Sequence, residues 1–152
     1  MAEVLIMLGS KSDLEFGEKC QKTLDSLEIS NELVISSAHR QPQKTSALAS
    51  EAQDKGVKAI ICMAGMAAHL PGVVASQTDL PVIGVPLSGS ALNGLDALLS
   101  IVQMPKGVPV GTVALGKAGA ENSALLAARI IALSRPEVYN KLNEYRQKLM
   151  SK

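Results

Sequence analysis

The chain has 152 residues, a formal net charge of +1, and a composition that is 47% hydrophobic but only 2% aromatic. Such a chain lacks the basic patches and aromatic stacking platforms of nucleic-acid-binding proteins. Its longest apolar stretch (124–133) is too short to span a bilayer, and Cys20 and Cys62 fit no disulfide framework or zinc motif. With no secretory leader at the N-terminus, we expect one cytoplasmic domain over residues 1–152, without nucleic-acid or membrane partners.

Short apolar runs alternate with segments of helical period from the start of the chain. Residues 4–8 form a continuous apolar run, typical of a strand covered on both faces. A turn at 9–13 follows, in which Ser12 or Asp13 is a natural N-cap for the next helix. Apolar residues then recur on one face of that helix, at Phe16, Cys20, Leu24 and Leu27.

The same alternation continues to the end of the chain. A second strand at 32–35 precedes a helix that extends to about Lys55 and is capped by Gly56. A third strand at 59–63 leads into a loop of small residues at 64–72. The remaining elements are, in order, a strand at 82–85, a helix at 95–102, a strand at 108–115, a loop at 116–120, a small-residue helix at 121–133, and a charged helix after Pro136 with Val138, Leu142, Tyr145 and Leu149 on one face.

Five strands that alternate with helices predict an α/β fold. Right-handed crossovers then build a single-domain, doubly wound parallel sheet of the flavodoxin or Rossmann type, with three αβα layers and an extra C-terminal helix. In such sheets, ligands bind in the loops that follow the carboxyl ends of the strands. Both histidines, His39 and His69, lie in loops at that edge.

The first of these loops, residues 9–13, has features of a phosphate or ribose site. Gly9 permits a tight turn, the following helix N-terminus offers free N–H groups, and Ser10 and Ser12 add hydroxyls. Asp13 would repel a phosphate but suits a ribose diol, whose hydroxyls donate to a carboxylate. The alternative is that Ser12 and Asp13 only cap the helix.

The second loop places Ser37, Ala38, His39 and Arg40 directly after a strand. Arginine binds phosphate or carboxylate through two parallel hydrogen bonds, and histidine exchanges a proton near neutral pH. The alternative is a histidine packed at a helix start beside an Arg40 that is paired with a surface carboxylate. The position at the strand edge favours function.

The third loop, residues 64–72, surrounds His69 with small residues that let the backbone approach a flat ligand. The same composition also suits tight packing between subunits. His39 and His69 lack the spacing of metal ligands on one element, so we expect no metal. From the residues alone, the chain is a small-molecule enzyme or binding protein for a phosphorylated ligand, with His39 as the best titrating group.

Charge is distributed unevenly along the chain. Residues 1–58 hold 16 charged side chains, whereas residues 82–134 hold five. A monomer of this size cannot bury 53 residues completely, and large uncharged patches seldom stay exposed. This stretch therefore favours a homo-oligomer over an Ala/Gly-rich surface that faces water.

Four motifs occur in an order and spacing that resemble one family. They are Gly9-Ser10-Lys11-Ser12-Asp13, Ser37-Ala38-His39-Arg40, Ala64-Gly65 with Ala67-Ala68-His69-Leu70-Pro71-Gly72, and Ser100-Ile101-Val102-Gln103-Met104-Pro105. Together, over nearly the whole chain, they resemble the bacterial 5-(carboxyamino)imidazole ribonucleotide mutases, the mutase branch of the phosphoribosylaminoimidazole carboxylase catalytic-subunit family. The histidine-containing third loop resembles the mutases, because the related carboxylases have Ser-Asn there and lack the histidine.

The resemblance implies an isomerase of purine biosynthesis that moves a carboxylate from the exocyclic amine of an aminoimidazole ribonucleotide to ring carbon 4, without a cofactor or metal. Carbon dioxide is lost and held until the ring carbon attacks it, with His39 as the implied general acid/base. Ser10, Asp13 and Arg40 match substrate-binding positions, and Ser12 and Ser37 assist with the phosphate. The third loop would face the imidazole and the migrating carboxylate, through Gly65, Met66, Ala67, Ala68, His69 and Leu70.

Two residues depart from the family pattern. Met66 stands where many members have glycine, and Gln41 stands where many have threonine before Pro42. Met66 could alter the loop that holds carbon dioxide. The family is octameric, with sites near subunit boundaries, so the resemblance implies a homo-octamer.

Two alternatives stay open at this point. One is a carboxylase that adds free carbon dioxide to the aminoimidazole ribonucleotide. The other is a non-catalytic binding protein for phosphoribosyl ligands, because a fold does not decide a function.

Overall fold

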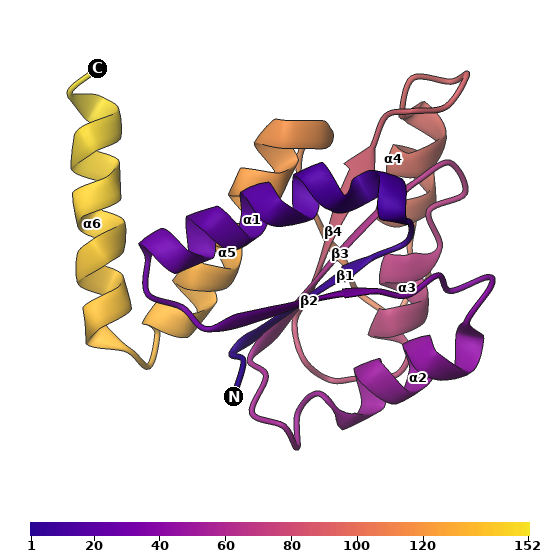
Figure 1. Cartoon of the computed structure of the whole chain (residues 1–152), viewed down its shortest axis with the longest axis horizontal. Helices are drawn as coiled ribbons and strands as arrows, with labels where there is room; N and C mark the ends of the chain where they lie inside the picture. Colours follow the sequence, from indigo (N-terminus) through magenta and orange to yellow (C-terminus); the bar gives the residue numbers. More distant parts are fainter.

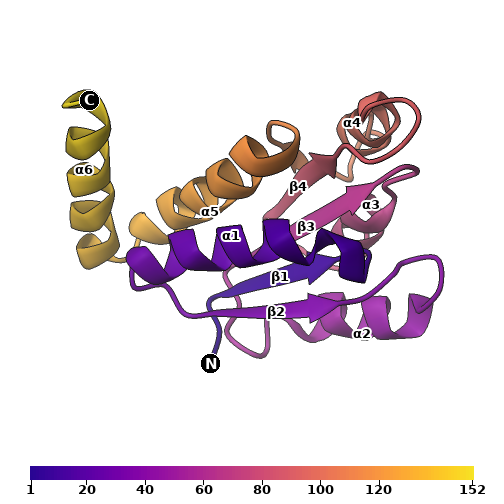
Figure 2. The same ribbon diagram turned by 45° about the horizontal axis from the view of Figure 1, so that its top comes forward.

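Five parallel strands form the central sheet of the computed structural model, which describes residues 1–152 (Figure 1, Figure 2). The spatial order of the strands is β2-β1-β3-β4-β5, and every neighbouring pair is parallel. The sheet therefore grows in both directions from β1, which confirms the predicted doubly wound α/β fold. The strands are β1 (Val4–Leu8), β2 (Asn31–Ile35), β3 (Ala59–Gly65), β4 (Val82–Leu87) and β5 (Gly111–Thr112).

Helices cover both faces of the sheet. Figure 1 shows α1 and α5 on one side and α2 and α3 on the other, with α6 standing apart from the sheet. The helices are η1 (Lys11–Asp13, a 3-10 turn), α1 (Leu14–Ser26), α2 (Pro42–Glu51), α3 (Leu70–Ala75), α4 (Leu95–Val102), α5 (Gly116–Ala132) and α6 (Pro136–Met150).

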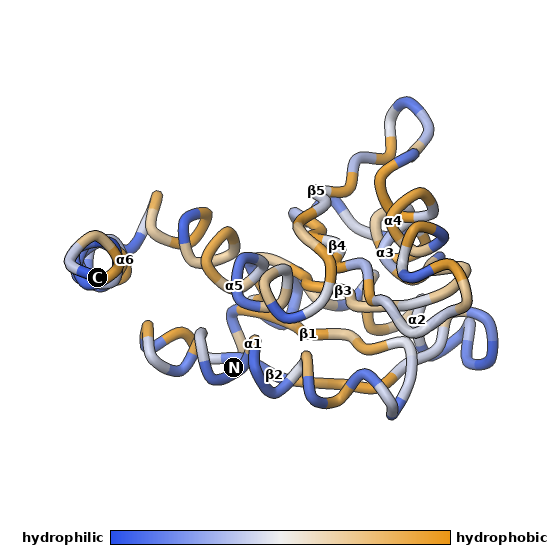
Figure 3. Tube along the Cα trace, turned by 90° about the horizontal axis from the view of Figure 1, so that it is seen from above, coloured by the Kyte–Doolittle hydropathy of each residue, from blue (hydrophilic) through white to orange (hydrophobic).

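The continuous apolar run of β1 supplies both hydrophobic cores. Successive side chains of a strand point to opposite faces, so Ile6 belongs to the core cluster that includes residues of α1, α5 and α6, whereas Met7 belongs to the cluster that includes residues of α2, α3 and α4. All five residues of β1 are buried, as expected of a strand covered on both faces. Figure 3 shows β1 as an orange, hydrophobic stretch in the middle of the molecule.

The predicted boundaries near α5 are wrong. The expected strand at 108–115 pairs only over Gly111–Thr112, and the expected loop at 116–120 is the beginning of α5, which starts five residues before the predicted helix at 121–133. Gly119 explains the error: a Cβ atom there would lie 1.6 Å from the carbonyl oxygen of Ala114. The glycine permits a close backbone contact inside a helix and does not mark a loop.

Three smaller boundaries also differ from the predictions. The helix after β2 ends at Glu51 and not near Lys55, because the chain then runs through turns to Gly56, whose φ is 85°. The loop at 64–72 contains the first turn of α3, which we did not predict. β4 continues through Pro86 to Leu87, since this proline pairs in register with Ala64 of β3.

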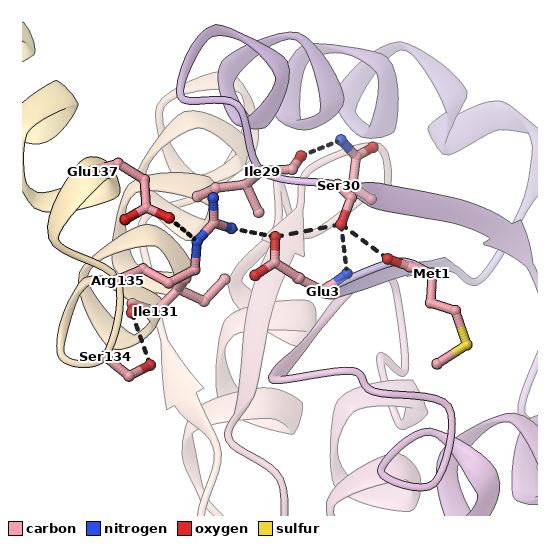
Figure 4. A network of polar contacts seen from close by, with 9 residues as sticks. Met1, Glu3, Ile29, Ser30, Ile131, Ser134, Arg135 and Glu137 are labelled. Carbon is pink, nitrogen blue, oxygen red and sulfur yellow. Dashed lines mark hydrogen bonds and ion pairs between the residues drawn. The ribbon is translucent and has the colours of Figure 1, made fainter.

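A polar network anchors the beginning of α6 to the beginning of β1 (Figure 4). The guanidinium of Arg135 forms ion pairs with Glu3 and Glu137. Ser30 joins the network, because its hydroxyl accepts a hydrogen bond from the Glu3 N–H (3.1 Å) and donates to the Met1 carbonyl (3.0 Å). The network holds the first turn of α6 against the edge of the domain opposite the candidate site.

Candidate active site

A cavity of about 550 Å³ opens at the carboxyl ends of β1, β2, β3 and β4. Figure 2 shows the arrowheads of these strands pointing the same way, so that the four following loops meet. The cavity is lined from β1 by Gly9, Ser10, Ser12 and Asp13, from β2 by Ser37, Ala38, His39 and Arg40, from β3 by Ala64, Gly65, Met66, Ala67, His69 and Leu70, and from β4 by Leu87, Ser88 and Gly89.

The loop after β1 places Asp13 in the lining of the cavity. Ser10 caps the 3-10 turn by accepting a hydrogen bond from the Ser12 N–H (3.4 Å), and the Ser12 hydroxyl donates to Ser10 Oγ (3.0 Å). Asp13 occupies the N-cap position of α1, but its side chain makes no capping hydrogen bond. The predicted N-cap position at Asp13 is therefore confirmed, but the side-chain hydrogen bond that usually accompanies an N-cap is not formed.

Partial burial affects the pKa of the Asp13 carboxyl group. Removal from water raises the pKa of Asp13, and a hydrogen bond from the Ser10 backbone opposes the rise. A carboxylate in this position accepts hydrogen bonds from hydroxyl donors, as a ribose diol requires.

The loop after β2 presents an arginine without a carboxylate partner. Ser37 Oγ accepts hydrogen bonds from the Arg40 backbone N–H (3.2 Å) and from Arg40 Nε (3.4 Å), which orients the guanidinium. Arg40 takes part in none of the six ion pairs of the chain. The pairing of Arg40 with a surface carboxylate, which the sequence left open, does not occur. The guanidinium is available for an anionic ligand.

The two histidines of the chain meet in the cavity. His39 Nε2 lies 2.7 Å from His69 Nδ1, and the rings pack edge to face with centroids 4.8 Å apart. One of these two nitrogens donates and the other accepts, so a single proton lies between His39 Nε2 and His69 Nδ1. Sequence reasoning placed both residues at the same sheet edge but missed this contact, and no local pattern links positions thirty residues apart.

The loop after β3 turns sharply to bring His69 into place. Met66 adopts a left-handed conformation with φ of 56°. The Ala68 N–H then donates to the Met66 carbonyl (2.9 Å), and the His69 N–H donates to the Ala67 carbonyl (2.8 Å). These tight turns place His69 at the N-cap position of α3, directly at the cavity.

Eleven of the twelve predicted site residues line the cavity, and Ala68 does not. Ala68 is 1% exposed and belongs to the hydrophobic core on the α2–α4 side of the sheet. Sequence reasoning missed Leu87, Ser88 and Gly89, which lie two to four residues after the fourth predicted strand (82–85) and were identifiable by that position alone. Gln41 precedes α2 and lies outside the lining.

This arrangement suits a phosphorylated ligand that exchanges a proton. Hydroxyls, an oriented guanidinium and a carboxylate that takes part in no ion pair surround part of the cavity, which is the chemistry that phosphate and ribose require. The paired imidazoles lie among small residues, where a planar ring can approach the backbone closely. No three His, Cys, Asp or Glu side chains converge as metal ligands, and no helix is long and apolar enough to cross a membrane.

Comparison with known proteins gives consistent results. Residues 3–152 match the model of a family described as AIR carboxylase. The N5-carboxyaminoimidazole ribonucleotide mutase of Pyrococcus abyssi is 49% identical over 97% of this chain and 83% of its own length. The enzyme of the same name from Brucella melitensis is 51% identical over 95% of this chain and 90% of its own. The crystal structure of Treponema denticola PurE superposes with a TM-score of 0.88 at 28% identity, covering 97% of this chain and 91% of that one.

Proposed function

The chain belongs to the AIR carboxylase family, and from this premise we propose that it is an isomerase of purine biosynthesis. It converts 5-carboxyamino-1-(5-phosphoribosyl)imidazole to 5-amino-1-(5-phosphoribosyl)imidazole-4-carboxylate by intramolecular carboxylate transfer. The observation that carries the proposal is the His39–His69 pair at the mouth of a cavity lined by small residues. Two relatives named as mutases at 49% and 51% identity support the same reaction.

The reaction needs one group that gives a proton and takes it back. In the first half, the bond between the exocyclic nitrogen and the carboxylate carbon breaks. The electron pair stays on nitrogen, which accepts a proton from His39, and carbon dioxide is formed. In the second half, ring carbon 4 bonds to the carbon dioxide and returns its proton to His39. Protons and electrons balance, and His69 orients the His39 ring through their hydrogen bond.

Binding of the ribonucleotide uses the loops after β1 and β2. Arg40, oriented by Ser37, provides a fixed positive group for the phosphate, and Ser10 and Ser12 add hydroxyl donors. Asp13 accepts hydrogen bonds from the ribose hydroxyls. These anchors hold the imidazole at the histidine pair, so that the reacting atoms meet without a diffusion step.

A direct test separates this isomerase from a carboxylase, the activity after which the family is described. We expect rapid turnover of the carboxyamino ribonucleotide at low bicarbonate, and little turnover of the unmodified aminoimidazole ribonucleotide under the same conditions. Product formation is followed by chromatography, with an enzyme-free sample as the control for spontaneous decarboxylation. Efficient use of the unmodified ribonucleotide at low bicarbonate would identify a carboxylase, and binding without conversion would identify a non-catalytic protein.

We also propose that the enzyme works as a cytoplasmic homo-octamer. In the charge-poor stretch, Leu95, Leu99 and Val102 lie on one side of α4 and are 55%, 50% and 48% exposed. An apolar helix face of this kind is typical of a surface that a second copy covers. Cys20 and Cys62 are unpaired thiols in the core, as is usual for proteins of reducing compartments.

Light scattering tests the assembly. We expect a particle of eight times the 15.9 kDa chain, and a smaller particle for Leu99→Asp, because a charge on the α4 face opposes burial against a second copy. Ala47→Asp is the matched control, since Ala47 is exposed on α2, outside the charge-poor stretch, and should leave the particle unchanged. A monomer of the unmodified chain in dilute solution would contradict the proposal.

A further inference from the structure

Met66 combines two unfavourable features at the cavity. Its φ of 56° is a left-handed conformation, which costs little for glycine but is strained for a residue with a long side chain. The residue is also 64% exposed, although its side chain is apolar. Substitution by glycine would relieve both features. Strain that persists at a binding site suggests that the side chain serves the site.

The surroundings of Met66 show what its side chain can do there. The neighbouring lining residues Ala64, Gly65 and Ala67 are small. The two larger apolar residues of the lining, Leu70 and Leu87, are each only 2% exposed and are held in the protein interior. Met66 is therefore the one long, flexible apolar residue of this lining that is not held in the protein interior.

The cavity needs such a cover for the chemistry proposed above. In the single chain, His39 and His69 are exposed in the open cavity, so no other residue of this chain keeps water from the position where carbon dioxide would be formed. An uncharged gas makes no strong hydrogen bond with the protein and is retained only by exclusion of solvent and closed walls. Backbone and small side chains shape the walls, but they provide no movable apolar group.

We propose that Met66 folds over the bound ribonucleotide and closes the cavity during the interval in which carbon dioxide is free. This inference rests on the proposed isomerase function. When the carbon–nitrogen bond has broken and nitrogen has taken the proton from His39, two outcomes compete. Ring carbon 4 bonds to the carbon dioxide and returns its proton to His39, or the gas escapes and the aminoimidazole ribonucleotide is released. Met66 suppresses the escape.

Isotope exchange measures how much carbon dioxide escapes from the cavity during turnover. Unlabelled carboxyamino substrate is converted in the presence of ¹³C-bicarbonate and carbonic anhydrase, and mass spectrometry gives the labelled fraction of the 4-carboxylate product. We expect little label with the unmodified enzyme and several-fold more with Met66→Gly, together with more released aminoimidazole ribonucleotide. Met66→Leu keeps an apolar cover and should stay close to the unmodified enzyme. Enzyme-free samples correct for spontaneous loss.

The stability of Met66→Gly separates a role of Met66 in the reaction from a role in folding. Because glycine adopts a positive φ without strain, Met66→Gly should melt at the same temperature as the unmodified protein or a few degrees higher. A more stable but leakier enzyme would show that the strained methionine serves the reaction. Equal labelling by both proteins, with turnover intact, would overturn the role of Met66 while leaving the proposed function in place.

Peroxide oxidation provides a readout that needs no turnover. Saturation with the 4-carboxylate product should slow sulfoxide formation at Met66 several-fold, because the thioether then packs on the ligand. Met150, which is 73% exposed at the end of α6, is the internal control and should not respond. An unprotected Met66 in the ligand-bound protein would overturn the proposal. A protein that neither binds nor converts these ribonucleotides would remove the proposed function itself, and the inference with it.

Discussion

His39→Asn is expected to lower turnover of the carboxyamino ribonucleotide by about two orders of magnitude or more, the range in which general acid–base groups contribute. The imidazole gives a proton to the exocyclic nitrogen and takes one from ring carbon 4, and an amide does neither. His39 is exposed at the cavity and packs only against His69 among the aromatic rings, so the substitution leaves the core intact. Steady-state kinetics, with calorimetric binding of the 4-carboxylate product, measures the effect.

His39→Gln is the control that separates proton transfer from positioning. The longer glutamine amide reaches the position of the histidine Nε2 and can still hydrogen bond to His69 Nδ1, which lies 2.7 Å from that atom in the protein. If the hydrogen bond alone were required, glutamine would restore turnover. We expect both variants to bind the product and to remain inactive. Turnover near that of the unmodified enzyme in either variant would exclude His39 as the proton carrier.

Gly119→Ala is expected to destabilise the protein by about 3 kcal/mol, the upper end of the usual cost of overpacking. Alanine normally favours a helix interior over glycine, so the expected sign is opposite to helix propensity. The reason is steric: the new Cβ would lie 1.6 Å from the Ala114 carbonyl oxygen and 3.1 Å from Val85 Cγ1. Since the first contact is with the backbone of Ala114, which lies between β5 and α5, the beginning of α5 and this connecting segment must move apart.

Thermal unfolding at a matched protein concentration tests this expectation. Gly111→Ala is the control, because a Cβ at that position meets nothing closer than 3.7 Å and Gly111 does not have a positive φ. We expect the melting temperature of Gly111→Ala to stay close to that of the unmodified protein, and that of Gly119→Ala to fall by several degrees. Equal melting temperatures for the two variants would show that the backbone at Ala114 moves aside with little loss of stability.

Elements with strong hydrophobic patterns were predictable from the sequence, and elements held by tertiary contacts were not. β1 and α4 have the predicted bounds, because a continuous apolar run and an apolar helix face define them locally. The beginning of α5 was mistaken for a loop, since its glycines are typical of loops in isolation. Only the approach of Ala114 to Gly119 shows why a helix needs a glycine there.

The candidate site was likewise predictable only in part from the sequence. The sequence by itself determined which loops carry chemistry, because polar residues follow predicted strands and the carboxyl ends of parallel strands share one edge. It could not determine that Ala68 turns into the core, since the orientation of loop residues depends on the elements that pack around them.

Only the tertiary structure decided that His39 and His69 form one hydrogen-bonded pair. They follow β2 and β3, which are separated by β1 in the sheet, so their contact depends on how far each loop extends over the strand between them. The strained backbone of Met66 was not predictable from the sequence either. A residue other than glycine rarely adopts a positive φ, and it does so where the surrounding structure requires it. Local pattern therefore determined the fold class and the position of the site, whereas contacts between segments distant in sequence determined its geometry.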